Sequence, residues 1–339
     1  MREENGATVG ELGEGGVLRR VLAQLGSAPA ARIGPGDDSA VVAVDGELVV
    51  TSDTMIEGPD FRLAWHSGFE LGWKLAATNL SDVAAMGARP IGLTVALACP
   101  RDTPVGLLEE IARGLDAACR ELGGCGVVGG DLGTSPVLTA AVTAFGELQG
   151  RPAVLRSGAR PGDTVAYAGE LGLAGLGLSL LFEEAAEKDG TAHARTLPEL
   201  RERHPAAIGA QLAPTAPVLS GLAAAQAGAT AMMDVSDGLS LDAARLGAAS
   251  GVAIELDPAL LEAGFGVQSG QRVPIEAMLA GGEDHGLLAT FPVGAALPAG
   301  FRPIGTVSEP RADGAGVLLD GDPYEPRGWD PYRVVLPGS

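Results

Sequence analysis

The feature that most constrains this chain is a recurring arrangement in which a short apolar run is followed by small residues and then by an aspartate. It occurs at Asp53, Asp131 and Asp234, and Asp237 comes three residues after the last of these. Short apolar runs bounded by glycine and small polar residues predict β-strands. Helical patterns alternate with these runs, and ligands of open α/β folds bind beyond the ends of strands. The arrangement therefore predicts an α/β fold with acidic loops around a ligand.

A predicted helix over residues 68–87 adds polar groups to this set. Its apolar stripe, which includes Leu71 and Leu75, is interrupted by Asn79 and Asp82. A buried carboxylate costs free energy unless it is paired or binds a metal ion. Asp82 is therefore a further candidate metal ligand.

Carboxylates that converge without matching lysines or arginines suggest bound divalent cations. Oxygen donors with no histidine or cysteine among them favour magnesium or manganese over zinc. The three cysteines form no C-x-x-C pair and the four histidines are scattered, which argues against a zinc site or a disulfide framework. The competing interpretation is that these aspartates only cap turns and helices.

Charge and hydropathy argue against two classes of partner. A formal net charge of −20 makes nucleic acid a poor partner. No apolar run reaches the roughly 20 residues that a membrane helix needs, and Met1–Glu4 leads into no signal-peptide core. We expect a cytoplasmic protein that binds neither nucleic acid nor membrane.

Two domains are predicted, because 339 residues exceed one ordinary core. A stretch rich in glycine and proline at 148–161 separates domains of 1–150 and 151–339. The turn Asp45-Gly46 between two strand patterns predicts a hairpin. The expected helices cover 11–26, 68–87, 104–122, 240–249 and a segment that follows a glycine-rich turn and ends at 186. The expected strands cover 40–44, 47–51, 91–98, 137–147, 164–168, 229–233, 252–256, 287–291 and 303–307.

Two phosphate-binding patterns are absent, and a third is ambiguous. The chain contains neither G-x-x-x-x-G-K-[ST] nor the protein-kinase motifs. Gly169, Gly172, Gly175 and Gly177 follow a strand but do not fit G-x-G-x-x-G. This turn could hold a phosphate at a helix N-terminus, or it could only be a tight turn.

In their order along the chain, these segments resemble the thiamine-monophosphate kinase family, and the resemblance spans nearly all 339 residues. Asn79–Ala88, which reads NLSDVAAMGA, is the most specific of them, whereas a lone Gly-Gly-Asp is a weak signal. The other matching stretches are Gly34–Asp38, Thr51–Thr54, Gly129–Asp131, Arg156–Ala159, Asp234–Leu239, Gly281–Asp284 and Gly328–Asp330.

The resemblance implies a PurM-like fold, shared with aminoimidazole ribonucleotide synthetase, selenophosphate synthetase and a hydrogenase-maturation protein. In this plan, of the α+β sandwich type, an N-terminal α/β domain binds ATP and magnesium and pairs with its copy in a homodimer. A C-terminal α/β domain completes the nucleotide and substrate site. The implied ligands are ATP, several Mg2+ ions and thiamine monophosphate, bound in a cleft lined by the acidic loops.

Residue roles are carried over from the matching motifs. The resemblance assigns metal contacts to Asp38, Thr51, Ser52, Asp53, Asp82, Asp131, Asp234 and Asp237. It assigns ATP contacts to Gly130, Asp131, Arg156 and Ser236, and substrate contacts to Asp60, Glu283 and Trp329. The chain departs from the family at Asp60, where histidine is common, at Ala213-Pro214, where Arg-Pro is common, and at His285-Gly286, where Tyr-Glu is usual.

The implied reaction moves the γ-phosphoryl group of ATP onto thiamine monophosphate and gives thiamine diphosphate. The second pKa of a phosphate monoester is about 6, so the attacking oxygen is already largely anionic at neutral pH. We therefore expect direct in-line transfer with no residue acting as general acid or base, and with charge stabilised by magnesium and Arg156. If a phosphoenzyme did form, Asp37 and Asp284 would be the first acceptors to consider.

Two alternatives remain open at this point. One is another ATP-using enzyme of the same superfamily, similar to aminoimidazole ribonucleotide synthetase. The other is a nucleotide-binding regulator without turnover. The intact acidic segments argue against the regulator, because binding alone needs fewer carboxylates.

Overall fold

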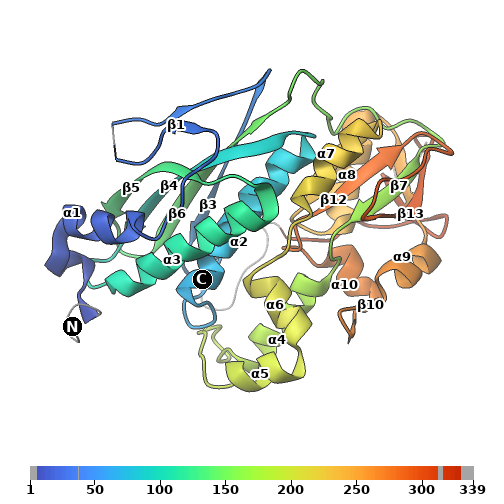
Figure 1. The fold of residues 1–339 in the computed structure, drawn as a ribbon. Helices are drawn as coiled ribbons and strands as arrows, with labels where there is room; N and C mark the ends of the chain where they lie inside the picture. Colours follow the sequence, from blue (N-terminus) through green and yellow to red (C-terminus); the bar gives the residue numbers. More distant parts are fainter. Residues whose placement is uncertain (1–5, 37, 312–315, 330–339) are drawn as a thin grey trace. The chain divides into compact units, whose positions relative to one another are not determined.

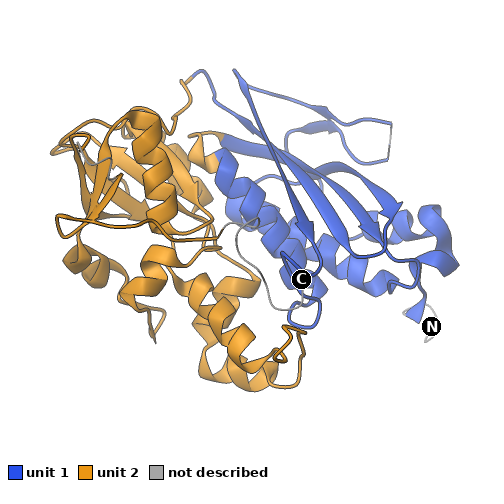
Figure 2. Ribbon diagram, turned by 180° about the vertical axis from the view of Figure 1, so that it is seen from behind, with its two compact units in different colours: residues 1–83, 89–150, 339 blue, residues 84–88, 151–338 orange. Residues whose placement is uncertain are grey.

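The computed structural model describes residues 6–36, 38–311 and 316–329, and these form two compact units (Figure 2). Unit 1 holds the described residues up to Val83 and those of 89–150, and unit 2 holds residues 84–88 and the described residues from Arg151 onward. No helix within the described ranges is both long and apolar enough to span a membrane.

Unit 1 contains a four-stranded sheet whose strand order is β3-β6-β4-β5. Strands β4 and β5 pair in parallel, and the other two pairs are antiparallel. Helices α2 and α3 lie on one face of this sheet (Figure 1). The elements of unit 1 are α1 (Val9–Leu22), β1 (Ala31–Ile33), β2 (Val41–Val42), β3 (Leu48–Ile56), α2 (Gly68–Ala85), β4 (Arg89–Cys99), α3 (Val105–Ala118), a π-helical turn (Cys119–Gly123), β5 (Val127–Thr134) and β6 (Thr139–Glu147).

Helix α2, which carries Asn79 and Asp82, is fixed by close backbone packing against α3. A Cβ atom at Gly72 would lie 2.0 Å from the carbonyl oxygen of Ile111, and one at Gly114 would lie 2.0 Å from that of Phe69. Only glycine allows two helices to approach this closely. These two contacts therefore fix the position of α2 against α3.

The hairpin predicted at Asp45-Gly46 is wrong. Strand β2 pairs with β1, and β3 pairs along its whole length with β6, from Leu48 opposite Glu147 to Ile56 opposite Thr139. The turn itself is tied to the end of β6, because the backbone N–H of Asp45 donates to Glu147 Oε2 at 2.8 Å. The pairing of β3 with β6, which is distant in sequence, therefore overrides the local turn signal.

Unit 2 contains a seven-stranded sheet with the order β15-β14-β9-β13-β7-β12-β8, in which only β14 and β9 pair in parallel. Two further strands, β10 (Val267–Gln268) and β11 (Gln271–Arg272), form a separate hairpin. The strands of the sheet are β7 (Thr164–Ala168), β8 (Ala231–Val235), β9 (Ala253–Leu256), β12 (Gly286–Phe291), β13 (Phe301–Ser308), β14 (Val317–Leu319) and β15 (Asp322–Pro323). The helices are α4 (Leu173–Glu184), α5 (Leu197–Arg203), α6 (Pro205–Leu212), α7 (Val218–Gln226), α8 (Leu239–Ser250), α9 (Pro258–Phe265) and α10 (Ile275–Ala280).

The core of unit 2 is formed by apolar side chains from both strands and helices. Tyr167 of β7 lies at its centre and packs edge-on against Phe265, with ring centroids 5.5 Å apart. Its hydroxyl group donates to the carbonyl oxygen of Glu170 at 2.7 Å, so the buried polar end has a partner. Strand β12 is buried at every residue, in keeping with its position between β7 and β8.

The β13–β9 pairing gives a stability test. A Cβ atom at Gly305 would lie 1.9 Å from the carbonyl oxygen of Glu255 on β9, so Gly305→Ala should lower the free energy of unfolding by about 1–3 kcal/mol in urea titrations. At Gly209 in α6 nothing lies within 4 Å of an added Cβ atom. The control Gly209→Ala should therefore raise stability by about 0.5–1 kcal/mol. Equal stability of Gly305→Ala and the wild type would contradict the strand pairing.

Candidate functional site

Three of the predicted ligand aspartates lie inside strands rather than after them. Asp53 is in β3, Asp131 in β5 and Asp234 in β8, and each of these strands is at an edge of its sheet. The expectation of acidic loops beyond strand ends is therefore wrong for these residues. An edge strand tolerates glycine and aspartate because one side of its backbone takes no part in the ladder.

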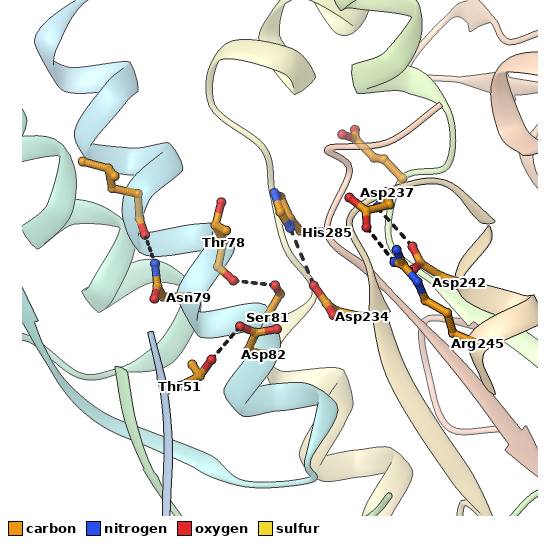
Figure 3. A network of polar contacts seen from close by, with 12 residues as sticks. Thr51, Thr78, Asn79, Ser81, Asp82, Asp234, Asp237, Asp242, Arg245 and His285 are labelled. Atoms are coloured by element: carbon orange, nitrogen blue, oxygen red, sulfur yellow. Dashed lines mark hydrogen bonds and ion pairs between the residues drawn. The ribbon is translucent and has the colours of Figure 1, made fainter. Parts of the chain in front are cut away.

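A first group of predicted ligands lies where β3 faces α2. The hydroxyl group of Thr51 donates to Asp82 Oδ2 at 2.8 Å (Figure 3). Asp53 shares this face of the sheet with Thr51, because alternate residues of a strand point to the same side. Ser52 points to the other face, where its hydroxyl group donates to the carbonyl oxygen of Val142 at 3.0 Å. The structure thus brings Thr51 and Asp82 together, places Asp53 on the same face of the sheet as Thr51, and directs the Ser52 hydroxyl group to the other face.

A second group lines a cavity of about 590 Å³ in unit 1. Asp38, Gly130 and Asp131 belong to its lining, and the remainder is largely apolar and comes from α1, α3, β4, β5 and the loop residues between α1 and β2. The volume falls in the range of small-molecule sites, which are mostly apolar with a few polar groups. Strands β3 and β5 are the two edges of the sheet, so this group is distinct from the one at Thr51.

Three segments of unit 2 converge on the end of β8. The N–H group of Glu283 donates to the carbonyl oxygen of Ser236 at 2.8 Å, and that of Trp329 donates to the carbonyl oxygen of Asp237 at 2.8 Å. Gly282 permits the approach, because a Cβ atom there would lie 2.4 Å from the carbonyl oxygen of Ser236. Ser236, Asp237, Glu283 and Trp329, which the motifs assigned to ligands, are therefore neighbours.

Asp237 has a cationic partner that the sequence interpretation missed. Arg245 Nη1 lies 2.6 Å from Asp237 Oδ2 and 2.6 Å from Asp242 Oδ1 (Figure 3). The premise that the acidic residues lack a matching arginine is thus wrong here. The signal available in the sequence was the spacing of Asp242 and Arg245, three residues apart on one helix. Burial raises the pKa of Asp242 to about 6, and hydrogen bonds from the Asp237 N–H and Arg245 oppose this shift.

His285 is a second neighbour that sequence reasoning treated only as a departure from the family pattern. Both His285 and Asp234 are buried. His285 Nδ1 lies 3.8 Å from Asp234 Oδ2 (Figure 3). The residue that replaces the usual tyrosine therefore lies against a predicted metal ligand.

Two other predicted contacts lie in turns. Asp60 Oδ2 accepts the backbone N–H of Ile56 at 2.7 Å, so this carboxylate closes its own turn. Arg156 is exposed in the segment that leads into β7. Asp37 and Asp330, which belong to two of the matching motifs, lie outside the described residues.

The glycine-rich turn does not present a free helix N-terminus. Asp284 Oδ2 accepts the N–H of Gly172 at 2.6 Å, and its Oδ1 accepts that of Ala174 at 2.8 Å. A carboxylate of the protein itself thus occupies the start of α4, where the alternative interpretation placed a phosphate. Burial raises the pKa of Asp284 to about 7, although the two N–H donors favour its ionised form.

The oxygen-only donor set fits magnesium. Within the described ranges, no three histidine, cysteine, aspartate or glutamate side chains are grouped closely enough to hold a metal ion by themselves. Magnesium is commonly held by one or two carboxylates together with water and substrate phosphates, so pairs of protein oxygens suffice. Such pairs are Thr51 with Asp82 and, along one cavity, Asp38 with Asp131.

Comparison with known proteins gives the family. Residues 36–148 match the family described as AIR synthase related protein, N-terminal domain. The thiamine-monophosphate kinase of Mycobacterium tuberculosis is 38% identical over 333 residues, covering 96% of this chain and 93% of its own. That of Aquifex aeolicus is 36% identical over 325 residues, covering 94% and 98%. This chain belongs to the thiamine-monophosphate kinase family.

Solved structures agree with this family assignment. AaThiL complexed with AMPPCP and TMP is 32% identical, with a TM-score of 0.71 over 94% of this chain and 97% of that chain. The thiamine-monophosphate kinase from Stenotrophomonas maltophilia is 29% identical, with a TM-score of 0.72 over 91% and 95%. The hydrogenase maturation protein HypE in complex with ATP, at 19% identity and a TM-score of 0.57, shares the fold alone. The predicted PurM-like, two-domain α/β fold and the family resemblance are confirmed.

The buried Asp284 gives a pH prediction. The folded state keeps a proton up to about pH 7 that the unfolded chain releases near its ordinary value of 3.8. The contribution of this group to the free energy of unfolding is therefore complete below pH 3.8 and is lost as the pH rises to about 7. The free energy of unfolding should fall by up to about 1.4 kcal/mol per pH unit across this range. Asp284→Asn should remove this component from urea unfolding measured between pH 4 and 8.

The matched control is Asp163→Asn. Asp163 is also buried and hydrogen-bonded, to the Arg160 N–H at 3.0 Å and to the Thr230 hydroxyl at 2.7 Å. Because this variant leaves Asp284 in place, its free energy of unfolding should fall with pH between 4 and 8 as that of the wild type does. An Asp284→Asn variant with the same slope as the control would contradict the prediction.

Proposed function

We propose that this protein transfers the γ-phosphoryl group of ATP to thiamine monophosphate in a magnesium-dependent reaction. The observation that carries the proposal is the similarity, over nearly the whole chain, to AaThiL, which was solved with AMPPCP and TMP. The acidic residues of both units support it, since their carboxylate oxygens suit magnesium, and magnesium in turn binds substrate phosphates.

The unit 1 cavity supports ATP binding. Its apolar lining suits an aromatic base, and Gly130 and Asp131 line the same cavity, where Gly130 would meet the phosphates directly and Asp131 through bound magnesium. Glycine at 130 is needed for packing, because a Cβ atom there would lie 2.2 Å from the carbonyl oxygen of Val95. Exposed Arg156 would hold a phosphate by its planar fork, and Ser236 would contribute a further contact.

The metal ligands in this proposal are Asp38, Thr51, Ser52, Asp53, Asp82, Asp131, Asp234 and Asp237. Bound magnesium would offset the charge of the phosphates. The protein's part is to position the carboxylates, and two observed contacts do so. Thr51 orients Asp82, and Arg245 orients Asp237. Ser52, whose hydroxyl group is bonded to β6, would take part through its carbonyl oxygen.

Glu283 and Trp329 would bind the thiamine moiety of the acceptor. They lie beside Asp237 and Ser236, so acceptor and phosphate contacts adjoin within unit 2. A carboxylate at Glu283 suits a cationic ring, and an indole at Trp329 suits stacking on it. Asp60 is a third proposed acceptor contact.

Direct in-line transfer is the proposed mechanism. The acceptor phosphate is already anionic near neutral pH, so no side chain has to remove a proton. His285 is buried in unit 2, with its Nδ1 atom 3.8 Å from Asp234 Oδ2. This burial argues against His285 as a general base for the acceptor. Asp284 is buried and accepts two N–H groups, which argues against it as a phosphoryl acceptor.

The face of the unit 1 sheet opposite α2 suits a homodimer interface. On β3 this face presents Leu48, Val50 and Ile56, which are 51%, 54% and 38% exposed. Exposed apolar residues grouped on one face mark interaction surfaces, and a second copy of the chain is the proposed occupant. The cytoplasmic location stays a prediction.

The test of the function is incubation of the protein with ATP, magnesium and thiamine monophosphate, followed by chromatography. Thiamine diphosphate and ADP should form in equal amounts. ADP without thiamine diphosphate would favour another ATP-using enzyme of the superfamily. ATP binding without turnover would favour a regulator.

The metal assignment predicts the effect of two substitutions. Asp53→Asn and Asp131→Asn should each abolish activity, by about 100-fold or more, while the urea unfolding curve stays close to that of the wild type. Asp102→Asn, at an exposed turn, is the control and should be fully active. Near-normal turnover of either test variant at saturating magnesium would refute the assignment.

The role of Asp60 is tested by comparing two variants. Asp60→Ala should raise KM for thiamine monophosphate by about tenfold and change KM for ATP less. Asp60→Asn removes the charge but can still accept the Ile56 N–H, so it distinguishes the effect of the charge from the effect of the turn. If only alanine raises KM, the charge is not used, and if KM for ATP rises more, the loop is misassigned.

A further inference from the structure

Asp284 is held by the backbone at the start of α4, where Gly172 lies 112 residues before it. Its two carboxylate oxygens accept the N–H groups of Gly172 and Ala174, at 2.6 and 2.8 Å. The first N–H groups of a helix have no partner within the helix, and the helix dipole favours negative charge there. At 3% exposed, this carboxylate is sealed from solvent, so the pair of bonds links α4 firmly to the segment of Asp284.

The residues on both sides of Asp284 have an unfavourable backbone conformation. Glu283 has φ of 75° and His285 has φ of 52°, in the left-handed region that residues other than glycine rarely adopt. Such conformations are strained and persist only where the surroundings impose them. Here the imposing contacts are the two bonds of Asp284 on one side.

The other side of the segment is held by β8 and the residue after it. The N–H groups of Glu283 and His285 donate to the carbonyl oxygens of Ser236 and Val235, at 2.8 and 3.2 Å. Helix α4 also approaches the segment closely at Gly175, where an added Cβ atom would lie 2.6 Å from the Cα atom of Gly281. The segment is thus fixed between α4 and β8, with the Glu283 side chain leaving it at a strained residue.

We propose that Asp284 is a positioning residue that holds Glu283 in the left-handed conformation from which its carboxylate meets the acceptor. The inference rests on the proposed function, in which Glu283 binds the thiamine moiety. Asp284 touches neither substrate in this account and acts only through Glu283. The strain at Glu283 is the cost of that orientation, and the bonds to α4 offset it.

The kinetic test compares Asp284→Asn with Asp163→Asn, an equally buried carboxylate on other partners. Asp284→Asn should raise KM for thiamine monophosphate by about tenfold, with kcat and KM for ATP within about twofold. The control should change no KM. A fall in kcat with unchanged KM would show a merely structural role and overturn the proposal.

A double-mutant cycle with Glu283→Gln shows whether Asp284 acts through Glu283. If it does, the double variant should have nearly the KM of Glu283→Gln alone, because both substitutions then remove the same interaction with the acceptor. A double variant whose KM rises by the product of the two single increases would contradict the proposal. If Asp284→Asn does not fold, Asp284→Ser replaces it, because its hydroxyl group can accept one of the two bonds.

Amide hydrogen exchange separates this inference from the proposed function. In Asp284→Asn, the amides of Glu283 and His285 should exchange at least about tenfold faster, and those of the control should not. Unchanged protection would overturn the proposal whatever the enzyme does. Faster exchange in a protein that never phosphorylates thiamine monophosphate would leave Asp284 as the anchor of the segment and refute the proposed function instead.

Discussion

A carboxylate within a β-sheet costs free energy unless water, a ligand or a partner compensates it, and the acidic residues of this protein are arranged around that constraint. Asp53 is half-buried and Asp131 exposed in the edge strands β3 and β5, whereas Asp234, in the edge strand β8, is buried beside His285. The interior strand β12 is apolar apart from Thr290 and buried throughout. Polar chemistry at the sheet edges and packing at the centre can therefore coexist in one fold.

Buried carboxylates meet the same constraint with built-in partners. Asp242 is compensated by Arg245 and by the N–H group of Asp237, and Asp284 by the first turn of α4. These partners are fixed parts of the fold rather than ligands. They orient the neighbouring Asp237 and Glu283, on which the proposed chemistry depends.

The sequence predicts well what depends on local periodicity. The helix expected over 68–87 is α2 at Gly68–Ala85, because its apolar stripe has unambiguous helical spacing. The hairpin at Asp45-Gly46 fails because β3 pairs with β6, which is distant in sequence. The extent of β5 is also missed, since Gly129-Gly130-Asp131 has poor strand propensity and continues the strand only through its pairing with β4.

Sequence motifs predicted some of the residues that meet in the candidate site, but not the contacts that hold them. Ser236, Glu283 and Trp329 come from three motifs and do meet in unit 2. The role of Asp284 could not be predicted, because its partners are backbone N–H groups of a distant helix and leave no side-chain signal. The phosphate alternative for the glycine-rich turn was open for the same reason.

The central claim is direct transfer of a phosphoryl group from ATP to thiamine monophosphate. A single-turnover reaction with γ-labelled ATP, magnesium and excess thiamine monophosphate tests it most directly, with the small molecules and the denatured protein counted separately. The account predicts that all transferred label appears in thiamine diphosphate and none on the protein, with or without the acceptor. Stoichiometric label on the denatured protein, or no labelled thiamine diphosphate, would contradict it.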